Sequence, residues 1–200
     1  MSTLPATIVM ASSNAGKIQE LARLLQPLGV TVISQTELGV SDAQETGSTF
    51  AANSLLKAQH ACNVTGIAAI ADDSGLAVAA LGGAPGVYSA RYAGAGASDA
   101  ANIDQLLTNL DGVTDRSAAF HCVATLVLRD AVEPLVASGV WHGSILDARQ
   151  GNGGFGYDPV FLDPESASSA AQLSAAEKNA RSHRGIAIRN LVALIEQRFS

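Results

Sequence analysis

Three short apolar runs in the first half of the chain predict β-strands. These runs span residues 7–11, 30–34 and 66–70. Between the first two runs, isoleucine and leucine recur at helical spacing from Ile18 to Leu28, and Gly29 is typical of a helix end. The first half of the chain is therefore expected to alternate between strand and helix.

Three further helices are predicted from the same spacing of apolar residues. Ser48 is the expected N-cap of a helix that ends near Asn63, and Ser98 is expected to cap another. A final helix is expected from about His183 to Phe199. The apolar positions of the three helices are, in order, Phe50, Leu55, Leu56 and Cys62; Ile103, Leu106, Leu107 and Leu110; and Ile188, Leu191, Val192 and Ile195.

Two longer strands are predicted at residues 118–128 and 135–145, as an antiparallel pair joined across Arg129 and Asp130. A hairpin inserted after alternating strands and helices predicts an α/β fold built on a mixed, twisted sheet with flanking helices. No internal repeat and no linker rich in proline, glycine and serine divides the chain, so one domain over residues 1–200 is expected. The hairpin is expected to form a second lobe, with Asp73 in a cleft between lobes.

Composition excludes several classes of protein. Hydrophobic residues make up 48% of the chain and charged residues 15%, which is typical of a compact soluble protein. The net charge of −6 argues against a nucleic-acid partner, and no apolar window is long enough to span a membrane. Cys62 and Cys122 have no metal-ligand spacing, and residues 1–7 lack the features of a signal peptide. A cytoplasmic protein with reduced core cysteines is therefore expected.

The most informative segment is Ala71-Asp72-Asp73-Ser74-Gly75, which directly follows the third apolar run. Ligands bind at the carboxyl ends of strands in α/β sheets, and a buried aspartate is costly unless it is paired or metal-bound. Two consecutive aspartates at a strand tip therefore predict a metal or acid/base site. Because side chains alternate along a strand, Asp72 and Asp73 are expected to face opposite ways and to do different jobs. An ordinary turn is the alternative, since Asp-Ser-Gly is common turn chemistry.

A candidate phosphate-binding loop lies between the first strand and the first helix. It consists of Ser12, Ser13, Asn14, Ala15, Gly16 and Lys17. Backbone N–H groups at a helix start attract phosphate, and Lys17 adds a cation. The loop does not match the Walker A pattern, because Ala11 and Ile18 stand where glycine and serine or threonine are required. An ordinary capped helix start is the alternative.

A second candidate segment, Glu45-Thr46-Gly47, leads into the predicted helix that contains Asn53 and Lys57. Asn53 and Lys57 have i,i+4 spacing and therefore lie on one helical face. A carboxylate before a helix ordinarily complements the helix dipole. Asn53 and Lys57 are equally compatible with a solvated helix face, so both interpretations stay open from the residues.

Residues 151–156 match the pattern G-x-G-x-x-G, but Pro159 follows too closely for a dinucleotide-binding helix to begin there. The glycines and Phe155 instead predict a loop whose backbone approaches a ligand closely while the aromatic ring stacks on a base. A flexible surface loop is the alternative.

The most basic stretch of the chain, residues 177–185, offers cationic side chains that suit an anion or a base edge. Its candidates are Lys178, Arg181, His183 and Arg184, and a solvated helix start is the alternative. The remaining histidines share no ligand spacing and are expected to be structural. They are His60, His121 and His142.

In combination and in this order, these motifs resemble those of the inosine/xanthosine triphosphate pyrophosphatases, Mg²⁺-dependent enzymes of purine nucleotide pools. The resemblance extends from Ser12 to Arg189 and rests on six segments. The segments are Ser13–Lys17; Glu45–Gly47 with Thr49–Phe50; Ala71–Leu76; Gly82–Tyr92; Gly153–Pro159; and Lys178 with Ser182–Gly185.

The resemblance implies a mixed α/β fold of two lobes around a central nucleotide cleft, a homodimer, and hydrolysis of ITP, dITP and XTP to the monophosphate and pyrophosphate. It implies that Asp73 is the proton acceptor and a contact of Mg²⁺, with Glu45 as the second expected metal ligand. Residues 12–17 match positions that hold the phosphates. Other positions that match substrate-binding residues are Ser74, Phe155, Gly156, Tyr157, Asp158, Lys178, His183 and Arg184, with Asn53 and Lys57 as further candidates.

The chain departs from the family's pattern at two places. Gln44-Glu45 stands where some members carry two glutamates, and Ala52-Asn53-Ser54 stands where the family often shows Glu-Asn-Ala. For specificity, donors from His183, Arg184 or nearby backbone are expected to bind the 6-oxo group of the base, which adenine lacks. Guanine shares that group, so its rejection must depend on the 2-position. A phosphotransferase and a non-catalytic nucleotide-binding module are the alternative functions.

Overall fold

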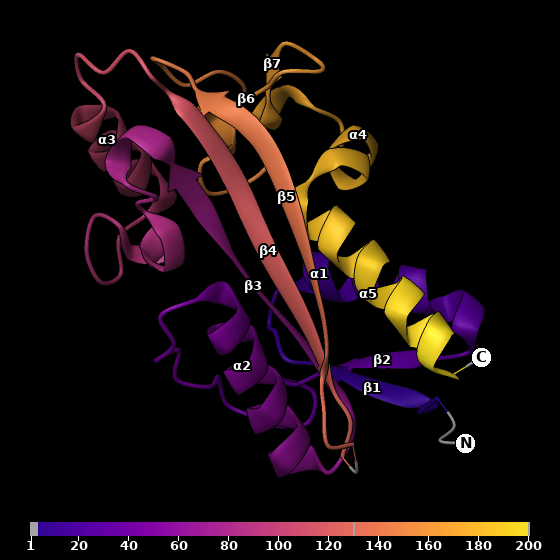
Figure 1. Cartoon of the computed structure of the whole chain (residues 1–200). Helices are drawn as coiled ribbons and strands as arrows, with labels where there is room; N and C mark the ends of the chain where they lie inside the picture. The colour runs from indigo at the N-terminus through magenta and orange to yellow at the C-terminus, as the bar shows by residue number, and fades with distance from the viewer. Residues whose placement is uncertain (1–3, 130, 200) are drawn as a thin grey trace. The chain divides into compact units, whose positions relative to one another are not determined.

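The computed structural model describes residues 4–129 and 131–199 and contains a seven-stranded sheet with flanking helices (Figure 1). The strand order is β2-β1-β3-β4-β5-β6-β7. The strands are β1 (Thr7–Met10), β2 (Thr31–Ser34), β3 (Ala69–Val78), β4 (Ser117–Val127), β5 (Leu135–Ile145), β6 (Phe161–Asp163) and β7 (Ser168–Ser169). β1 pairs in parallel with β2 and β3, whereas β6 pairs antiparallel with β5 and β7. The sheet is therefore mixed, and the predicted α/β fold is confirmed.

Five α-helices and five 3₁₀-helices are described in residues 4–129 and 131–199. The α-helices are α1 (Ala15–Leu25), α2 (Phe50–Thr65), α3 (Asp99–Asn109), α4 (Ala175–Arg181) and α5 (His183–Phe199). The 3₁₀-helices are η1 (Gln26–Leu28), η2 (Ala79–Leu81), η3 (Gly86–Arg91), η4 (Asp158–Val160) and η5 (Ala170–Gln172). None of the described helices is long and apolar enough to cross a membrane.

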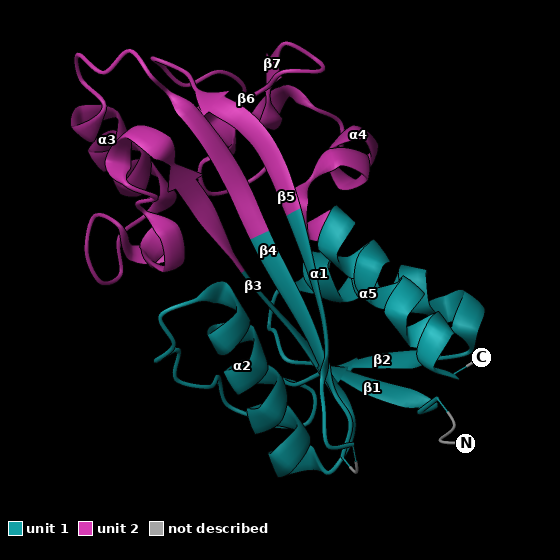
Figure 2. Ribbon diagram, viewed as in Figure 1, with its two compact units in different colours: residues 1–73, 122–139, 186–200 teal, residues 74–121, 140–185 magenta. Residues whose placement is uncertain are grey.

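Contacts divide the chain into two compact units (Figure 2). Unit 1 takes its described residues from 1–73, 122–139 and 186–200, and unit 2 comprises residues 74–121 and 140–185. β3, β4 and β5 contribute residues to both units. The prediction of one domain with a cleft between two lobes stays a prediction.

In unit 1, alternate residues of β1 pack into two different apolar clusters. Ile8 and Met10 join leucines and isoleucines of α1 and α5, whereas Val9 packs with the small residues of α2. The α1 and α5 cluster is built mainly from large aliphatic side chains, and the α2 cluster from alanines and Cys62. Because alanine is short, α2 lies close against the strands, which brings its side chains near those of β3.

The predicted apolar face of α2 is partly wrong. Leu55 and Leu56 are only partly buried, whereas Ala58 and Ala61 are fully buried. Leucines suit a helix packed at ordinary distance, but the close approach of α2 to the strands leaves room only for small side chains. The N-cap is Thr49 rather than Ser48, because Thr49 Oγ1 accepts the Ala52 N–H at 3.1 Å.

The third strand also differs from its prediction. It was expected to end at residue 70, with the aspartates at its tip, but β3 continues to Val78 and contains Asp72 and Asp73. Lysine side chains lie against both carboxylates, and this compensation allows charged residues inside a buried strand.

Several other boundaries are confirmed. Gly29 ends η1 with a φ of 72°, Ser98 caps α3 by accepting the Ala101 N–H, and α5 has its predicted limits. β4 and β5 are adjacent and lie within one residue of the predicted strands. Asp130, expected in their connection, lies outside the described residues. Cys62 and Cys122 are buried and are not joined in a disulfide, as predicted.

The core of unit 2 encloses a charged group near the end of β6. Asp163 is buried and accepts hydrogen bonds from Trp141 Nε1 at 3.0 Å, Arg181 Nη1 at 2.8 Å and the Ser166 N–H at 3.0 Å. Arg181, a candidate anion-binding residue in the sequence, is therefore engaged in fixing β6. Burial alone would raise the pKa of Asp163, but hydrogen bonds from Ser166, Trp141 and Arg181 outweigh it and lower the pKa.

We expect Asp163→Asn to lower the free energy of unfolding at pH 7 by about 2 kcal/mol, because it weakens these charge-assisted bonds. A carboxylate with a lowered pKa contributes stability above its unfolded pKa of about 4, and this contribution is lost as pH falls through the folded value. The difference between wild type and variant is therefore expected to shrink below about pH 4. Denaturant unfolding between pH 2.5 and 7 measures this difference in the free energy of unfolding. The control is Asp111→Asn, which changes an exposed aspartate. A difference that does not change with pH contradicts this expectation.

Candidate functional site

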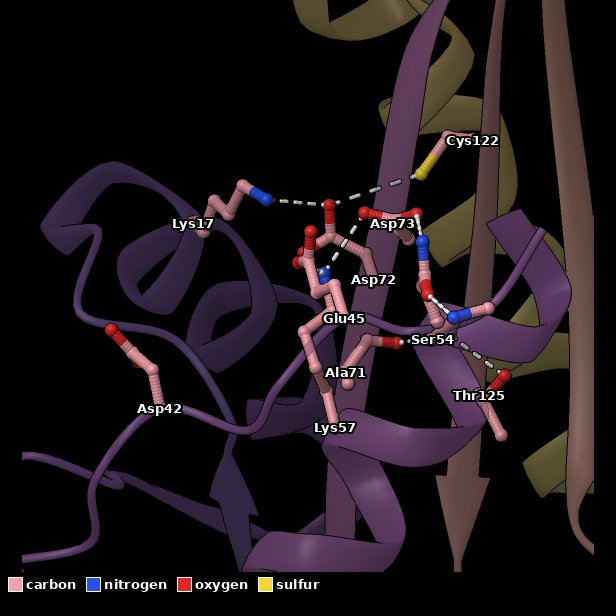
Figure 3. A network of polar contacts seen from close by, with 12 residues as sticks. Lys17, Asp42, Glu45, Ser54, Lys57, Ala71, Asp72, Asp73, Cys122 and Thr125 are labelled. Carbon is pink, nitrogen blue, oxygen red and sulfur yellow. Dashed lines mark hydrogen bonds and ion pairs between the residues drawn. The ribbon is translucent and has the colours of Figure 1, made fainter. Parts of the chain in front are cut away.

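Asp72 and Asp73 lie in β3 just beyond the carboxyl end of β1. The register of the parallel pair places Met10, the last residue of β1, opposite Ile70. The two aspartates have different partners: Asp72 contacts Lys17 of α1, and Asp73 contacts Lys57 of α2 (Figure 3). Asp73 also contacts Asn53 of α2. The expectation that the two carboxylates face opposite ways is confirmed.

The Asp72 carboxylate is held by the first turn of α1. Lys17 Nζ lies 2.7 Å from Asp72 Oδ2, and the Asp72 side chain is only 1% exposed, against 20% for Lys17. Cys122 Sγ lies 4.0 Å from the same oxygen. Because a buried carboxylate needs a cation, Asp72 fixes Lys17 at the start of α1.

The candidate phosphate loop forms the N-terminus of α1. Asn14 caps the helix by accepting the Lys17 N–H at 3.1 Å, and Ser12 Oγ accepts the Asn14 N–H at 3.2 Å. Ser13, Asn14, Ala15 and Gly16 are exposed, whereas Ser12 and Lys17 are partly buried. The capped helix start is therefore confirmed, and phosphate binding by this loop stays a prediction.

Asp73 belongs to a second group of polar side chains on α2 and the preceding loop. Lys57 Nζ lies 3.0 Å from Asp73 Oδ1 and 2.7 Å from Glu45 Oε1 (Figure 3). Asn53 Nδ2 donates to Asp73 Oδ2 at 3.2 Å, and Asn53 is fully buried. These contacts exclude a merely solvated helix face for Asn53 and Lys57. They also show that Glu45 pairs with a side chain in the middle of α2.

Burial and pairing set the protonation of this group. Burial raises the pKa of Asp73 above the ordinary value of an aspartate, although the Lys57 ammonium opposes the shift. Burial would lower the pKa of Lys57, but the Asp73 and Glu45 carboxylates outweigh it and raise the pKa. Lys57 is therefore protonated near neutral pH, and Asp73 binds a proton more readily than an exposed aspartate does.

The carboxylates of Glu45 and Asp73 meet the chemical requirements of a Mg²⁺ site. Both approach the same ammonium group, so their oxygens converge on one centre of positive charge. In residues 4–129 and 131–199, no group of three or more His, Cys, Asp or Glu side chains is placed to hold a metal. Mg²⁺ is commonly held by one or two carboxylates together with substrate phosphates, so this donor set fits that ion.

A separate group of candidate residues assembles within unit 2 around the exposed ring of Phe155. Asp158 Oδ2 accepts the Phe155 N–H at 2.8 Å and forms an ion pair with Lys178. Lys178 Nζ lies 4.7 Å from the centre of the Phe155 ring, and Arg184 Cζ lies 5.5 Å from it. Gly154 is required beside this group, because its φ is 73° and a Cβ there would lie 2.0 Å from Asp158 Oδ2.

The other predicted residues of unit 2 have mainly structural contacts. Tyr157 is buried and donates from its hydroxyl to Ser89 O at 2.9 Å, and His183 is buried with its ring stacked on Phe120. Burial also raises the pKa of Tyr157. The Gly156 N–H donates to Asp99 Oδ2 at 2.6 Å. Ser74, the first residue of unit 2, is partly buried in β3.

Three residues had no individual role predicted from the sequence, although Gly47 belongs to a candidate segment. The Gly47 N–H donates to Asn53 Oδ1 at 2.8 Å, and Ser54 Oγ lies 2.8 Å from Thr125 Oγ1. A Cβ at Gly47 would lie 2.7 Å from Asn53 Oδ1, so this position needs glycine. One indication in the sequence that Ser54 is unusual is that it lies in Ala52-Asn53-Ser54, which departs from the family's pattern.

We expect Lys17→Met to lower the free energy of unfolding by about 3 kcal/mol, because it removes the ammonium that contacts the buried Asp72 carboxylate. Adding Asp72→Asn is expected to recover much of this loss, since the buried charge is then gone. Denaturant unfolding of both variants measures the effect. The control is Arg23→Met, which removes an exposed cation from the same helix. Equal stability of Lys17→Met and Arg23→Met would show that the ion pair contributes nothing.

Comparison with known proteins places the chain in a family. It matches the model described as the Ham1 family over residues 8–194. A dITP/XTP pyrophosphatase from Pectobacterium atrosepticum is 55% identical over 189 residues, which cover 92% of this chain and 95% of that protein. A HAM1 protein from Coxiella burnetii has a TM-score of 0.91 and 47% identity, covering 96% of this chain and 98% of that one.

A second solved structure, the Ham1 protein from Staphylococcus aureus, has a TM-score of 0.90 and 44% identity. It covers 96% of this chain, and 99% of its own chain is covered. The family model spans nearly all of the sequence, and the relatives match it along nearly their whole length. The chain therefore belongs to the Ham1 family.

Proposed function

We propose that the protein hydrolyses nonstandard purine nucleoside triphosphates, namely ITP, dITP and XTP, to the monophosphate and pyrophosphate with Mg²⁺. Membership of the Ham1 family and a relative named dITP/XTP pyrophosphatase support this substrate class. The observation that carries the reaction type is the Asp73 carboxylate, held between Asn53 and Lys57 with a raised pKa. A homodimer in the cytoplasm is part of the same proposal.

Asp73 is proposed as the proton acceptor. In hydrolysis, the oxygen of a water molecule bonds to phosphorus, the anhydride bond between the α- and β-phosphates breaks, and the water loses a proton. A carboxylate with a raised pKa is a stronger base than an ordinary aspartate. Asn53 and Lys57 fix both oxygens of Asp73, which supports the orientation of the attacking water.

Positive charge for the phosphates is proposed to come from Lys17, Lys57 and a bound metal. Lys17 lies at the N-terminus of α1, where backbone N–H groups also favour anions. Glu45 and Asp73 would hold Mg²⁺, which when bound would neutralise charge on the phosphate oxygens. The acidic protein, with a net charge of −6, otherwise offers little attraction for a triphosphate.

The purine base of the substrate is proposed to bind at the group of side chains around Phe155. The exposed ring is suited to stacking, and the neighbouring Lys178 and Arg184 side chains donate hydrogen bonds but do not accept them. Such donors favour the 6-oxo group of hypoxanthine or xanthine over the 6-amino group of adenine. His183, whose ring is buried and stacked on Phe120, is kept as a further candidate for binding the base.

The first test is pyrophosphate release from ITP, dITP, XTP, ATP and GTP, with Mg²⁺ and with EDTA. We expect rapid release from the first three nucleotides and none in EDTA. ATP is expected to react at least about 100-fold more slowly, because its amino group leaves base-binding donors unpaired. Orthophosphate in place of pyrophosphate would contradict the proposed products. Transfer to an acceptor would favour a phosphotransferase, and no reaction with any nucleotide would favour a binding module.

We expect Asp73→Asn to lower kcat for ITP by at least about 100-fold, because an amide cannot accept the proton from water. The fold is expected to survive, since asparagine has the shape of aspartate. Pyrophosphate release and thermal unfolding measure the two effects. Asp42→Asn is the matched control, because Asp42 is exposed on the loop that carries Glu45 and lies apart from Lys57 in Figure 3. Turnover of Asp73→Asn near that of wild type would exclude Asp73 as the proton acceptor.

A further inference from the structure

Two buried hydroxyl groups of unit 1 lie next to the polar group formed by Asp73, Asn53, Lys57 and Glu45. Ser54 Oγ, in the second turn of α2, lies 2.8 Å from Thr125 Oγ1 of β4 and donates to Ala71 O of β3 at 3.0 Å (Figure 3). Ser54 and Thr125 are both fully buried, with 0% exposure. These two buried hydroxyl groups thus join one helix to two strands by hydrogen bonds. Apolar side chains at the same positions would pack but could not form such bonds.

The joined positions are adjacent to the residues proposed for the chemistry. Ala71 precedes Asp73 by two residues and lies on the same face of β3. Ser54 directly follows Asn53 and precedes Lys57 by three residues, so all three side chains belong to neighbouring turns of α2. A displacement of α2 along β3 would therefore change the distances from Asn53 and Lys57 to Asp73.

Apart from the bonds of Asn53 and Lys57 to Asp73 itself, the contacts of α2 with the strands restrain such a displacement only weakly. The helix packs on β1 and β3 through alanines and Cys62. Short apolar side chains set how close the helix lies, but their contacts have no direction. Hydrogen bonds from Ser54 have narrow ranges of distance and angle, so they specify one position of the helix along the strand.

The same placement extends to the loop that carries Glu45. Asn53 Oδ1 accepts the Gly47 N–H at 2.8 Å while Asn53 Nδ2 donates to Asp73. The side-chain amide of Asn53 therefore bonds both to the Glu45 loop, through its oxygen, and to β3, through its nitrogen. A shift of Asn53 would weaken both hydrogen bonds. A contact that fixes this part of α2 therefore also fixes Asn53, Lys57 and the Glu45 loop relative to Asp73.

We infer that Ser54 and Thr125 are positioning residues that fix α2 against β3 and thereby hold Asn53 and Lys57 on the Asp73 carboxylate. The inference rests on the proposed function, in which Asp73 accepts the proton from water. Neither hydroxyl group is assigned a contact with substrate. Their effect is exerted through the placement of Asn53 and Lys57.

The test separates stability from turnover with four variants. Ser54→Ala leaves a buried Thr125 hydroxyl without its Ser54 contact, so the unfolding midpoint is expected to fall by about 5 °C. Ser54→Ala/Thr125→Val replaces both hydroxyls by apolar groups, and its midpoint is expected to return to within about 2 °C of wild type. Thr125→Ser keeps the hydroxyl but loses a methyl group, which is expected to lower the midpoint by about 3 °C. The control is Thr65→Ala, which removes a hydroxyl that donates to Ala61 O near the other end of α2.

Turnover is expected to follow the hydroxyl pair and not the midpoint. Ser54→Ala and the double variant are expected to lose roughly 10- to 100-fold in kcat for ITP, with KM changed less than about 2-fold. Thr125→Ser and Thr65→Ala are expected to keep kcat within about 2-fold of wild type, although they are less stable. The inference is overturned if kcat follows the midpoint across the series, or if the double variant turns over like wild type.

A second measurement tests the placement of Asn53 independently of activity. Hydrogen exchange of the Asn53 side-chain amide is expected to be slow in wild type and in Thr125→Ser, and at least about 10-fold faster in the double variant. Unchanged exchange in the double variant overturns the inference. Wild-type protein that releases no pyrophosphate would instead refute the proposed function, and the exchange rates would still decide whether the hydroxyl pair positions Asn53.

Discussion

A carboxylate inside a buried strand requires a cation against it, and β3 carries two carboxylates in succession. Strand geometry turns Asp72 and Asp73 to opposite faces, so one cation cannot serve both. Lys17 of α1 pairs with Asp72, and Lys57 of α2 pairs with Asp73. Helices from both faces of the sheet are therefore tied electrostatically to adjacent residues of one strand. The placement of α1 and α2 depends on this requirement.

The two aspartates differ in how far they are shielded. The side chain of Asp72 is 1% exposed and that of Asp73 is 12% exposed. Asp72 is thus suited to holding Lys17, whereas the Asp73 side chain keeps some solvent exposure. Asp73 also shares Lys57 with Glu45, which brings a residue of the preceding loop to the same centre of charge. Two identical residues adjacent in sequence thereby acquire different partners and different exposure from their surroundings.

Much of the fold was predictable because its apolar spacing and caps are local. Gly29, Ser98 and the limits of α5 follow from patterns within one element. Asp73, Lys57 and Phe155 could also be named as candidates from their segments, and their roles stay predictions. The extension of β3 was not predictable, because it depends on lysines supplied by two other elements. The same applies to Leu55 and Leu56, whose exposure follows from how closely α2 approaches the strands.

Ser54 and Thr125 illustrate the limit of reasoning from sequence. They are 71 residues apart, and each alone is an unremarkable small polar residue. Their contact forms only when α2 lies on β3 and β4, so no local sequence pattern predicts it. Gly47 depends on its surroundings in a related way over a shorter span, because its need for glycine comes from Ala52 and Asn53 of α2 and not from its own backbone conformation. Long-range hydrogen bonds of this kind become visible only in three dimensions.

The alanine-rich inner face of α2 has a consequence for which substitutions this helix can accept. Ala58 and Ala61 are fully buried, and a larger aliphatic residue at such positions ordinarily costs about 1–3 kcal/mol because neighbouring side chains and backbone must shift. Here a larger side chain would push the helix outward and carry Lys57 away from Asp73. The proposed role of Asp73 would then be impaired even in a variant that stays folded. The two alanine methyl groups thus help to hold Lys57 against Asp73, although neither side chain bonds to it.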